Sequence, residues 1–107
     1  MDGSIISLSE ASEMTSAFRK SFPNATLGVL YSANVFKDIL DQDNCVGIRI
    51  YNAQEADGSI TNVLVGVDEN GNDIFQGRIY EKGTKCPPLC SASNPLNEWE
   101  GYYLSFP

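Results

Sequence analysis

Residues 45–80 read CVGIRIYNAQEADGSITNVLVGVDENGNDIFQGRIY, and the two-residue periodicity of this segment governs the expected fold. From Val46 to Tyr51, apolar residues occupy every second position, which is typical of a strand with one buried face. Turn-forming residues interrupt the pattern at 56–58 and again at 69–72. Because each turn separates two strand-like runs, the segment predicts three consecutive antiparallel strands. These are residues 45–51, 60–67 and 73–80.

Asn70-Gly71 is the strongest hairpin signal in the chain, because both residues tolerate the positive φ of a type I′ turn. The surrounding segment Asp68–Asp73 also carries oxygen side chains at alternate positions, as the start of a calcium loop does. However, Asp73 stands where such a loop needs glycine, and Ile79 where it needs the bidentate glutamate. We therefore expect a hairpin turn and keep calcium binding as the minor alternative.

Two segments before the strands have helical periodicity. The first runs from Ile6 to Phe22, with Ser7 as its expected N-cap and Glu10 three positions later. The second is expected to begin after Ser32 and to run to about Gln42. We expect the apolar stripe of the first helix to be buried. It consists of Ala11, Met14, Phe18 and Phe22.

The order of these elements predicts an α+β fold in which two N-terminal helices pack on a three- to four-stranded antiparallel β-meander. A chain of 107 residues has the usual size of one domain, so we expect a single domain from residue 1 to 107. Residues 97–107 are expected to form an aromatic C-terminal extension of it. The expected core draws on every element: Met14, Phe18, Phe22, Val35, Ile39, Leu40, Val46, Ile48, Ile50, Val63, Val65, Phe75 and Ile79.

The chain is acidic, with fourteen carboxylates, seven basic side chains and a formal charge of -7. A surface of this sign repels phosphate groups, so we expect neither nucleic acid nor a membrane as a partner. No apolar run approaches the roughly 18 residues of a membrane span, and the N-terminus lacks the features of a signal peptide. We therefore expect a cytoplasmic protein whose partner is another protein or a second copy of itself.

The sequence contains no histidine. Histidine is the side chain whose ordinary pKa best suits proton transfer near neutral pH, and Ser-His and Cys-His nucleophile pairs depend on it. The glycine-rich motifs that bind nucleotide phosphates are also absent from the sequence. We therefore expect no enzymatic activity and no cofactor.

The three cysteines leave three interpretations open. Cys45 starts the first predicted strand, whereas Cys86 and Cys90 flank a Pro-Pro-Leu segment. The favoured interpretation is that all three thiols are reduced, because disulfides are rare in the cytosol. The alternatives are a disulfide between Cys86 and Cys90, or a zinc ion held by Cys45, Cys86 and Cys90 together with a fourth ligand.

Aromatic residues concentrate at the C-terminal end of the chain: Trp99, Tyr102, Tyr103 and Phe106. Large aromatic side chains dominate the energetics of protein interfaces. We therefore expect a non-enzymatic protein-binding, adaptor or self-associating domain that uses this segment together with the sheet. The alternative is that these side chains complete the core.

Two further functions stay open. Arg49 is the only cation inside the first predicted strand, and as an anion-contacting group it indicates a small-ligand site. An ion pair between Arg49 and an acid on a neighbouring strand is nevertheless the favoured interpretation. The acidic surface indicates an inhibitor of a basic partner, with an affinity that falls as salt rises.

Four strings of the sequence have a counterpart elsewhere: CVGIRIY at 45–51, VLVGVD at 63–68 with GND at 71–73, CPPLC at 86–90, and NPL at 94–96. In these the chain resembles a group of short uncharacterised proteins from Bacteroidota. The resemblance runs from the first helix to Leu96 and implies a cytoplasmic, bacterial protein. It implies no activity and no site residue.

Overall fold

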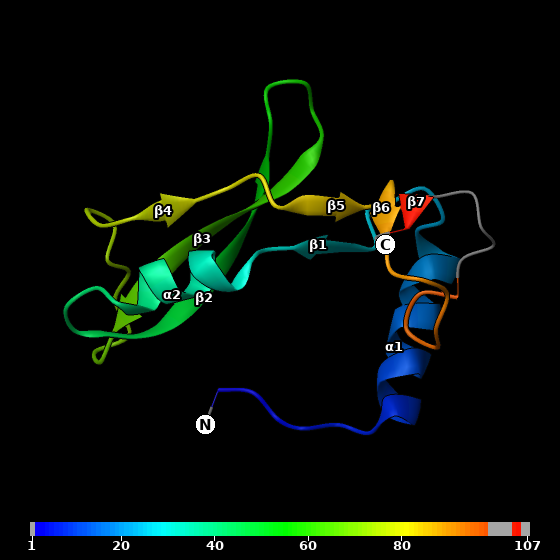
Figure 1. Ribbon diagram of the computed structural model, residues 1–107, viewed down its shortest axis with the longest axis horizontal. Coiled ribbons are helices and arrows are strands. Elements are labelled where there is room, and N and C mark those ends of the chain that lie inside the picture. The colour runs from blue at the N-terminus through cyan, green and yellow to red at the C-terminus, as the bar shows by residue number, and fades with distance from the viewer. Residues whose placement is uncertain (1, 99–103, 106–107) are drawn as a thin grey trace. The chain divides into compact units, whose positions relative to one another are not determined.

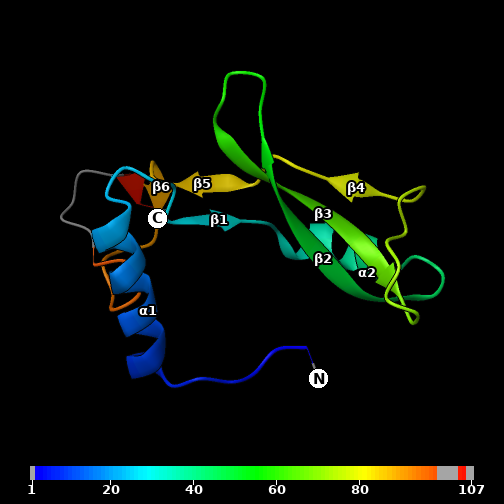
Figure 2. The ribbon, with the colours of Figure 1, turned by 180° about the vertical axis from the view of Figure 1, so that it is seen from behind.

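The structure is a computed structural model that describes residues 2–98 together with the backbone of residues 104 and 105. Figures 1 and 2 show its helices and strands from opposite sides. The chain divides into two compact units. The helix unit comprises residues 1–29 and 85–107, and the sheet unit comprises residues 30–84. The expectation of a single domain stays a prediction.

The sheet unit contains three antiparallel strands in the order β2-β3-β4. They are β2 (Cys45–Gln54), β3 (Ile60–Asp68) and β4 (Ile79–Tyr80). β2 and β3 form one long hairpin, and α2 (Ala33–Leu40) packs against both of them (Figure 2). The expected α+β class, with two helices and antiparallel sheets, is confirmed.

The register of the hairpin determines which side chains lie under α2. Ile50 pairs with Leu64 and Ile48 with Gly66, and directly opposite residues share a face of the sheet. This is the face that α2 covers, because a Cβ atom on Gly66 would lie only 3.4 Å from Cγ2 of Ile39. Ile39 and Leu64 are completely buried, so they form the centre of the sheet unit.

Polar contacts join α2 to the end of the meander. Ser32 is the expected N-cap, and its Oγ accepts a hydrogen bond from the N–H of Val35 at 3.4 Å. Farther along the helix, Asp38 accepts a hydrogen bond from the Tyr80 hydroxyl at 2.6 Å and lies 3.5 Å from Arg78. These contacts tie β4 to α2, although β4 contains only two residues.

The two hairpin turns share one hydrogen-bond pattern. In the first turn, the N–H of Gly58 donates to the carbonyl of Glu55 at 2.9 Å, and the N–H of Glu55 donates to the carbonyl of Ser59 at 2.8 Å. In the second turn, the N–H of Gly71 donates to the carbonyl of Asp68, and the N–H of Asp68 to the carbonyl of Asn72, both at 2.9 Å. Gly58 and Gly71 have φ values of +92° and +81°. Asn70 is not among the described non-glycine residues with positive φ, so the expected type I′ turn is wrong. Each turn is instead a three-residue loop in which a single left-handed glycine forms a G1 bulge.

The third strand is shorter than the periodicity indicated. Residues 73–80 were expected to pair throughout, but only Ile79–Tyr80 form a strand, and Asp73 makes an isolated bridge with Val67. Between these points the N–H of Gly77 donates to the carbonyl of Ile74 at 3.1 Å and closes a turn. The expected strand is therefore interrupted over residues 74–78.

A side chain from outside the strand bonds to the backbone at the end of this interruption. Oε1 of Gln42, which follows α2, accepts a hydrogen bond from the N–H of Arg78 at 2.7 Å. The Gln42 amide thus satisfies a backbone donor that a continuous strand would have paired with its neighbour. Alternation within residues 73–80 carries no sign of a contact that comes from 36 positions away.

The helix unit is built around α1 (Leu8–Ser21). Ser7 is its N-cap, as expected, because its Oγ accepts a hydrogen bond from the N–H of Glu10 at 3.0 Å and donates one to the Glu10 carboxylate at 3.1 Å. Neither of the described helices is long and apolar enough to cross a membrane. Four short strands form two further two-stranded sheets. In one, β1 (Gly28–Leu30) pairs with β5 (Thr84–Cys86), and in the other, β6 (Leu89–Cys90) pairs with β7 (Leu104–Ser105). The boundary between the two units falls within β1 and β5.

The expected core is wrong in most of its members. Ile39 and Val65 are buried, but many of the other predicted side chains are exposed: Met14, Phe18, Phe22, Leu40, Val46, Ile50, Phe75 and Ile79. The reason is that few of these side chains have an element packed over them. α2 has eight residues and covers only part of one face of the sheet, while α1 belongs to the helix unit and has no buried residue.

Candidate interaction site

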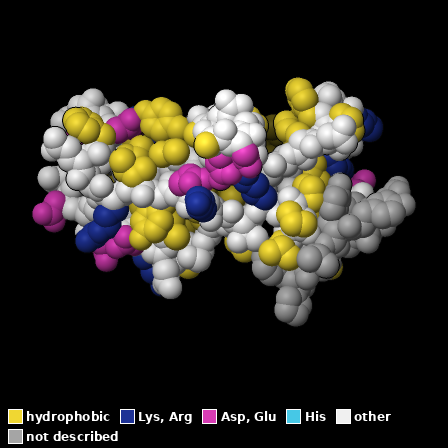
Figure 3. Space-filling view, turned by 90° about the horizontal axis from the view of Figure 1, so that it is seen from above, with side chains coloured by type: hydrophobic (Ala, Val, Ile, Leu, Met, Phe, Trp, Pro, Cys, Tyr) yellow, Lys and Arg dark blue, Asp and Glu magenta, His cyan; other side chains and the backbone are white. Residues whose placement is uncertain are grey.

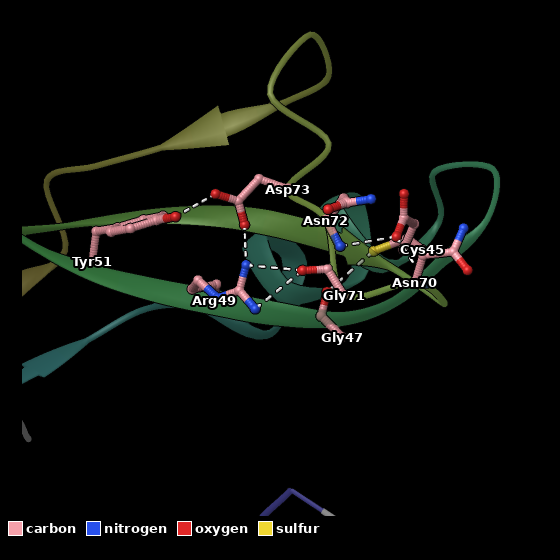
Figure 4. Close-up of polar contacts among 9 residues, drawn as sticks. Cys45, Gly47, Arg49, Tyr51, Asn70, Gly71, Asn72 and Asp73 are labelled. Atoms are coloured by element: carbon pink, nitrogen blue, oxygen red, sulfur yellow. Dashed lines mark hydrogen bonds and ion pairs between the residues drawn. The ribbon is translucent and has the colours of Figure 1, made fainter.

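A polar cluster lies on the face of the sheet opposite α2. Arg49 and Tyr51 are two residues apart on β2, so their side chains project from the same face. Nη1 of Arg49 lies 2.5 Å from Oδ1 of Asp73, and the Tyr51 hydroxyl donates to the other oxygen of that carboxylate. Both Nη atoms of Arg49 also lie 3.4 Å from the carbonyl oxygen of Gly71. Figure 4 shows the two β2 side chains converging on Asp73.

The cluster shifts the pKa of each of its members. The hydrogen bond from Tyr51, supported by Arg49, holds the pKa of Asp73 below its usual value, because both donors favour the carboxylate. The hydrogen bond to Asp73 is also the main reason that the pKa of Arg49 and the pKa of Tyr51 are raised. All three residues therefore keep their usual protonation states near neutral pH. The cluster fastens the turn at 68–72 to β2 and is not poised for proton transfer.

Arg49 therefore has the partner that was favoured from the sequence, an acid on the neighbouring part of the sheet. Its guanidinium group already binds a carboxylate and a carbonyl oxygen. The expectation that Arg49 contacts an anionic ligand stays a prediction.

The segment with the calcium-like sequence forms the expected hairpin turn. Oδ1 of Asp68 accepts hydrogen bonds from the N–H groups of Asn70 and Asn72 at 2.9 and 3.0 Å. Asp68 also lines a hollow of about 280 Å³ together with Asp43 and Asp73. Within the described residues, no three acidic or cysteine side chains are grouped so that they could hold a metal ion. Calcium binding by this turn stays a prediction.

Cys86 and Cys90 are joined by a disulfide, with their Cα atoms 4.8 Å apart. Cys45 is a free, half-buried cysteine whose thiol donates to the carbonyl of Gly47 at 3.3 Å. The favoured interpretation of three reduced thiols is therefore wrong for Cys86 and Cys90, and the disulfide alternative describes them. Zinc binds thiolates, so a site at Cys45, Cys86 and Cys90 stays a prediction for the reduced protein only.

The aromatic residues predicted to form an interface lie outside the described residues: Trp99, Tyr102, Tyr103 and Phe106. Their role as interface or core stays a prediction. The described residues carry exposed apolar side chains of their own, which Figure 3 shows in several groups among acidic and basic side chains.

One of these groups lies on α1. We call it the α1 stripe, and it consists of Leu8, Met14, Phe18 and the C-cap residue Phe22. These side chains are 58%, 66%, 41% and 56% exposed. The rings of Phe18 and Phe22 lie 5.0 Å apart between centroids and form one aromatic surface. Met14, Phe18 and Phe22 were predicted from the sequence as part of a buried stripe with Ala11, and Leu8 was not predicted.

A hollow of about 170 Å³ adjoins the α1 stripe. Its lining combines apolar side chains with one cation: Met14, Thr15, Phe18, Arg19, Leu27 and Leu96. Nη1 of Arg19 donates to the carbonyl of Leu96 at 2.7 Å, and Nη2 lies 3.8 Å from the carboxylate of Glu98. These contacts hold the apolar stem of Arg19 along the wall of the hollow while its charge is compensated.

Four residues that line this hollow were not predicted from the sequence: Thr15, Arg19, Leu27 and Leu96. Asn94 positions Leu96: its backbone N–H donates to the Asn97 side chain at 2.8 Å, and its own Oδ1 accepts the N–H of Leu96 at 2.8 Å. Asn followed by Pro is a turn signal, and it marks the place where Leu96 is brought to α1. The motif predicts the turn but does not predict which helix the turn contacts.

Comparisons with known proteins add no relative. No family model matches the chain, and neither a curated protein nor a solved structure is similar to it. The resemblance to a Bacteroidota group stays a prediction.

Proposed function

We propose that this chain is a non-enzymatic protein-binding domain that receives an apolar segment of a partner on the α1 stripe and in the hollow beside it. The observation that carries the proposal is that α1, a helix of fourteen residues, has no buried side chain, while Met14, Phe18 and Phe22 recur every four residues and are exposed. Contiguous exposed apolar surface on a small domain is typical of an interaction site. Helices gain most of their stability from a packed apolar face, and no residue of α1 is buried among the described residues.

The size of the hollow favours a protein partner over a small molecule. Pockets for drug-sized ligands enclose on the order of 300–1,000 Å³, whereas this hollow measures about 170 Å³. That space suits one bulky apolar side chain. The Phe18–Phe22 surface then contacts the residues of the partner that flank this anchor.

Charge narrows the class of partner. The chain carries a formal charge of -7, and the cation in the hollow, Arg19, is already compensated by Glu98. Long-range attraction therefore favours a neutral or basic segment over an acidic one. The expected partner segment is amphipathic, with a bulky apolar anchor and basic residues on its outer side. The acidic surface also indicated an inhibitor of a basic partner, and a basic segment on the α1 stripe is compatible with that alternative. Both predict that binding weakens as the salt concentration rises.

Peptide selection on the full-length protein tests the proposal. A random peptide library is selected on the immobilised chain, and the enriched peptides are titrated calorimetrically against three proteins: the parent, Phe18→Ser, and Ala17→Ser as the matched control. Ala17 is exposed on α1 and does not line the hollow. We expect enriched peptides with a bulky apolar anchor, binding reduced by at least tenfold in Phe18→Ser, and unchanged binding in Ala17→Ser.

Two results would contradict the proposal. One is that no peptide is enriched above the immobilisation matrix. The other is that enriched peptides bind Phe18→Ser as tightly as the parent while circular dichroism shows that both proteins are folded. In that case the α1 stripe is not the binding surface.

A further inference from the structure

β2 is an edge strand of ten residues. In the order β2-β3-β4, β3 lies on one side of β2, and none of the described strands lies on its other side. β2 pairs with β3 along nearly its whole length, from Cys45 opposite Asp68 to Gln54 opposite Ile60. An edge of this length presents a row of backbone N–H and C=O groups that can pair with another strand.

The hydrogen bonds around the hairpin identify the groups on this free edge. The N–H of Glu55 donates across the hairpin to the carbonyl of Ser59 at 2.8 Å, so odd-numbered positions of β2 point toward β3. On the far side of β3, the carbonyl of Gly66 accepts from the N–H of Ile74 at 2.8 Å, so the backbone groups of even-numbered β3 residues point away from β2. The odd-numbered residues of β3 therefore bond to β2, in agreement with the bond from Glu55 to Ser59. The outward backbone groups of β2 therefore belong to Ile48, Ile50, Asn52 and Gln54.

β2 lacks the features that usually prevent edge pairing. It contains no proline, lysine or acid, and its irregular register is confined to the step between Cys45 and Gly47. Large apolar side chains are exposed along it, with 65% of Val46, 57% of Ile50 and 44% of Tyr51 accessible. In a chain with a formal charge of -7, a strand without acids is also a place where two copies repel each other least.

We propose that β2 pairs with β2 of a second copy of this chain, antiparallel and about a two-fold axis at Ile50. In this register the outward groups of Ile50 meet those of Ile50 in the other copy, and Ile48 meets Asn52. The result is one continuous six-stranded sheet. Rotation about an axis perpendicular to the sheet leaves its faces unchanged, so both α2 helices lie on the same face.

The side chains of β2 are self-complementary in this register. Arg49, the only charged residue of β2, lies opposite Tyr51 of the second copy, so a cation meets an aromatic ring. Moving the axis to Arg49 would still pair the outward backbone groups, with Ile48 opposite Ile50, but it would place two guanidinium groups opposite each other. Repulsion between the two cations disfavours the axis at Arg49, whereas the axis at Ile50 brings Arg49 to Tyr51, and this complementarity is the argument for a second copy as the occupant.

Cysteine cross-linking tests the register directly. Hydrogen-bonded residues opposite each other in antiparallel strands have Cα atoms about 5.5 Å apart, within the roughly 4.4–6.8 Å that a disulfide spans. In a Cys45→Ser background, Ile50→Cys is therefore expected to form a covalent dimer under mild oxidation. Ile60→Cys is the matched control: Ile60 is 60% exposed on β3, away from the free edge, and should yield no dimer above background.

Analytical ultracentrifugation tests the pairing without a new cysteine. We expect the parent to sediment as a dimer and to shift toward monomer on dilution. Asn52→Pro removes an outward N–H that β3 does not use, so it should yield monomer with an unchanged circular dichroism spectrum. A parent that stays monomeric at the highest attainable concentration overturns the proposal, and so does a dimer that survives Asn52→Pro. Equal cross-linking of Ile50→Cys and Ile60→Cys also overturns it.

This pairing uses none of the residues of the α1 stripe. Phe18→Ser therefore tests peptide binding while leaving β2 intact, and Asn52→Pro tests self-association while leaving α1 intact. Failure of one proposal can be told apart from failure of the other.

Discussion

Gln42 and Gly77 approach each other so closely that a Cβ atom on Gly77 would lie 2.1 Å from Oε1 of Gln42. The same amide bonds in both directions: Oε1 accepts the N–H of Arg78 at 2.7 Å, and Nε2 donates to the carbonyl of Ile39 at 2.8 Å. On its other side, Nε2 would lie 3.0 Å from a Cβ atom on Gly66. Gln42 therefore links α2 to the last segment of the meander, and two glycines leave the space that it occupies.

Gly77→Ala is expected to destabilise the protein by about 1–3 kcal/mol. The added methyl group would force the Gln42 amide out of place, and the N–H of Arg78 would lose its acceptor. Urea denaturation followed by circular dichroism measures the change. Gly47→Ala is the control, because a Cβ atom on Gly47 would meet nothing within 4 Å.

A double-mutant cycle identifies the cause of that loss. If displacement of Gln42 is responsible, Gly77→Ala should cost clearly less in a Gln42→Ala background than in the parent. An equal cost in both backgrounds would show that the Gln42 side chain is not what Gly77 accommodates.

Asp73→Asn is expected to lower the unfolding free energy relative to the parent. This loss should be larger at neutral pH than at acidic pH. The pKa of Asp73 is lowered from its usual 3.8 by Tyr51 and Arg49, so the folded state favours the carboxylate. The contribution of Asp73 to the unfolding free energy is fully present above the pKa that it has in the unfolded state. It is lost as the pH falls through the lower pKa that it has in the folded state. The difference in unfolding free energy between parent and Asp73→Asn should therefore shrink from about pH 5 to about pH 2.

Glu69→Gln is the control for this titration. It removes one negative charge from an exposed position in the same turn but leaves Asp73 with Arg49 and Tyr51. Urea midpoints measured across the acidic range should show a smaller pH-dependent difference for Glu69→Gln. A difference for Asp73→Asn that is constant with pH would mean that its carboxylate does not favour the folded state.

Gly71 is expected to tolerate substitution in the order Gly, Asn, Ala, Val. Its φ of +81° lies in the left-handed region, where Asn is accepted better than Ala and a β-branched residue is worst. Space is not the limit, since a Cβ atom there would meet nothing within 4 Å. Gly71→Ala should cost about 1–2 kcal/mol by thermal or urea denaturation. If Gly71→Val is as stable as Gly71→Asn, the turn does not keep this conformation.

Features that depend on neighbours in the sequence could be predicted. Alternation placed β2 and β3, and the caps at Ser7 and Ser32 are local hydrogen bonds within three residues. The ion pair of Arg49 was anticipated in kind, because an arginine projecting from a strand usually finds an acid beside it.

Features that depend on long-range packing could not be predicted in the same way. The bond from Arg78 to Gln42 at the interruption of the third strand, and the exposure of Phe18, are not contained in the local pattern. The α1 stripe has the same helical periodicity whether it is buried or exposed. Periodicity identifies an apolar face, but the fold decides what covers it.

Thiol titration should find one reactive cysteine per chain in the unreduced protein after denaturation, and three after reduction. Cys45 is the free thiol, and Cys86 and Cys90 are paired within a short loop. Closing a loop of this size by a disulfide stabilises a fold by about 2 kcal/mol, so reduction should lower the unfolding free energy by about that amount. Cys45→Ser should reduce the first count to zero without changing the effect of reduction. Three reactive thiols before reduction would show that the bond between Cys86 and Cys90 is absent and would reopen the question of a metal on the three sulfurs.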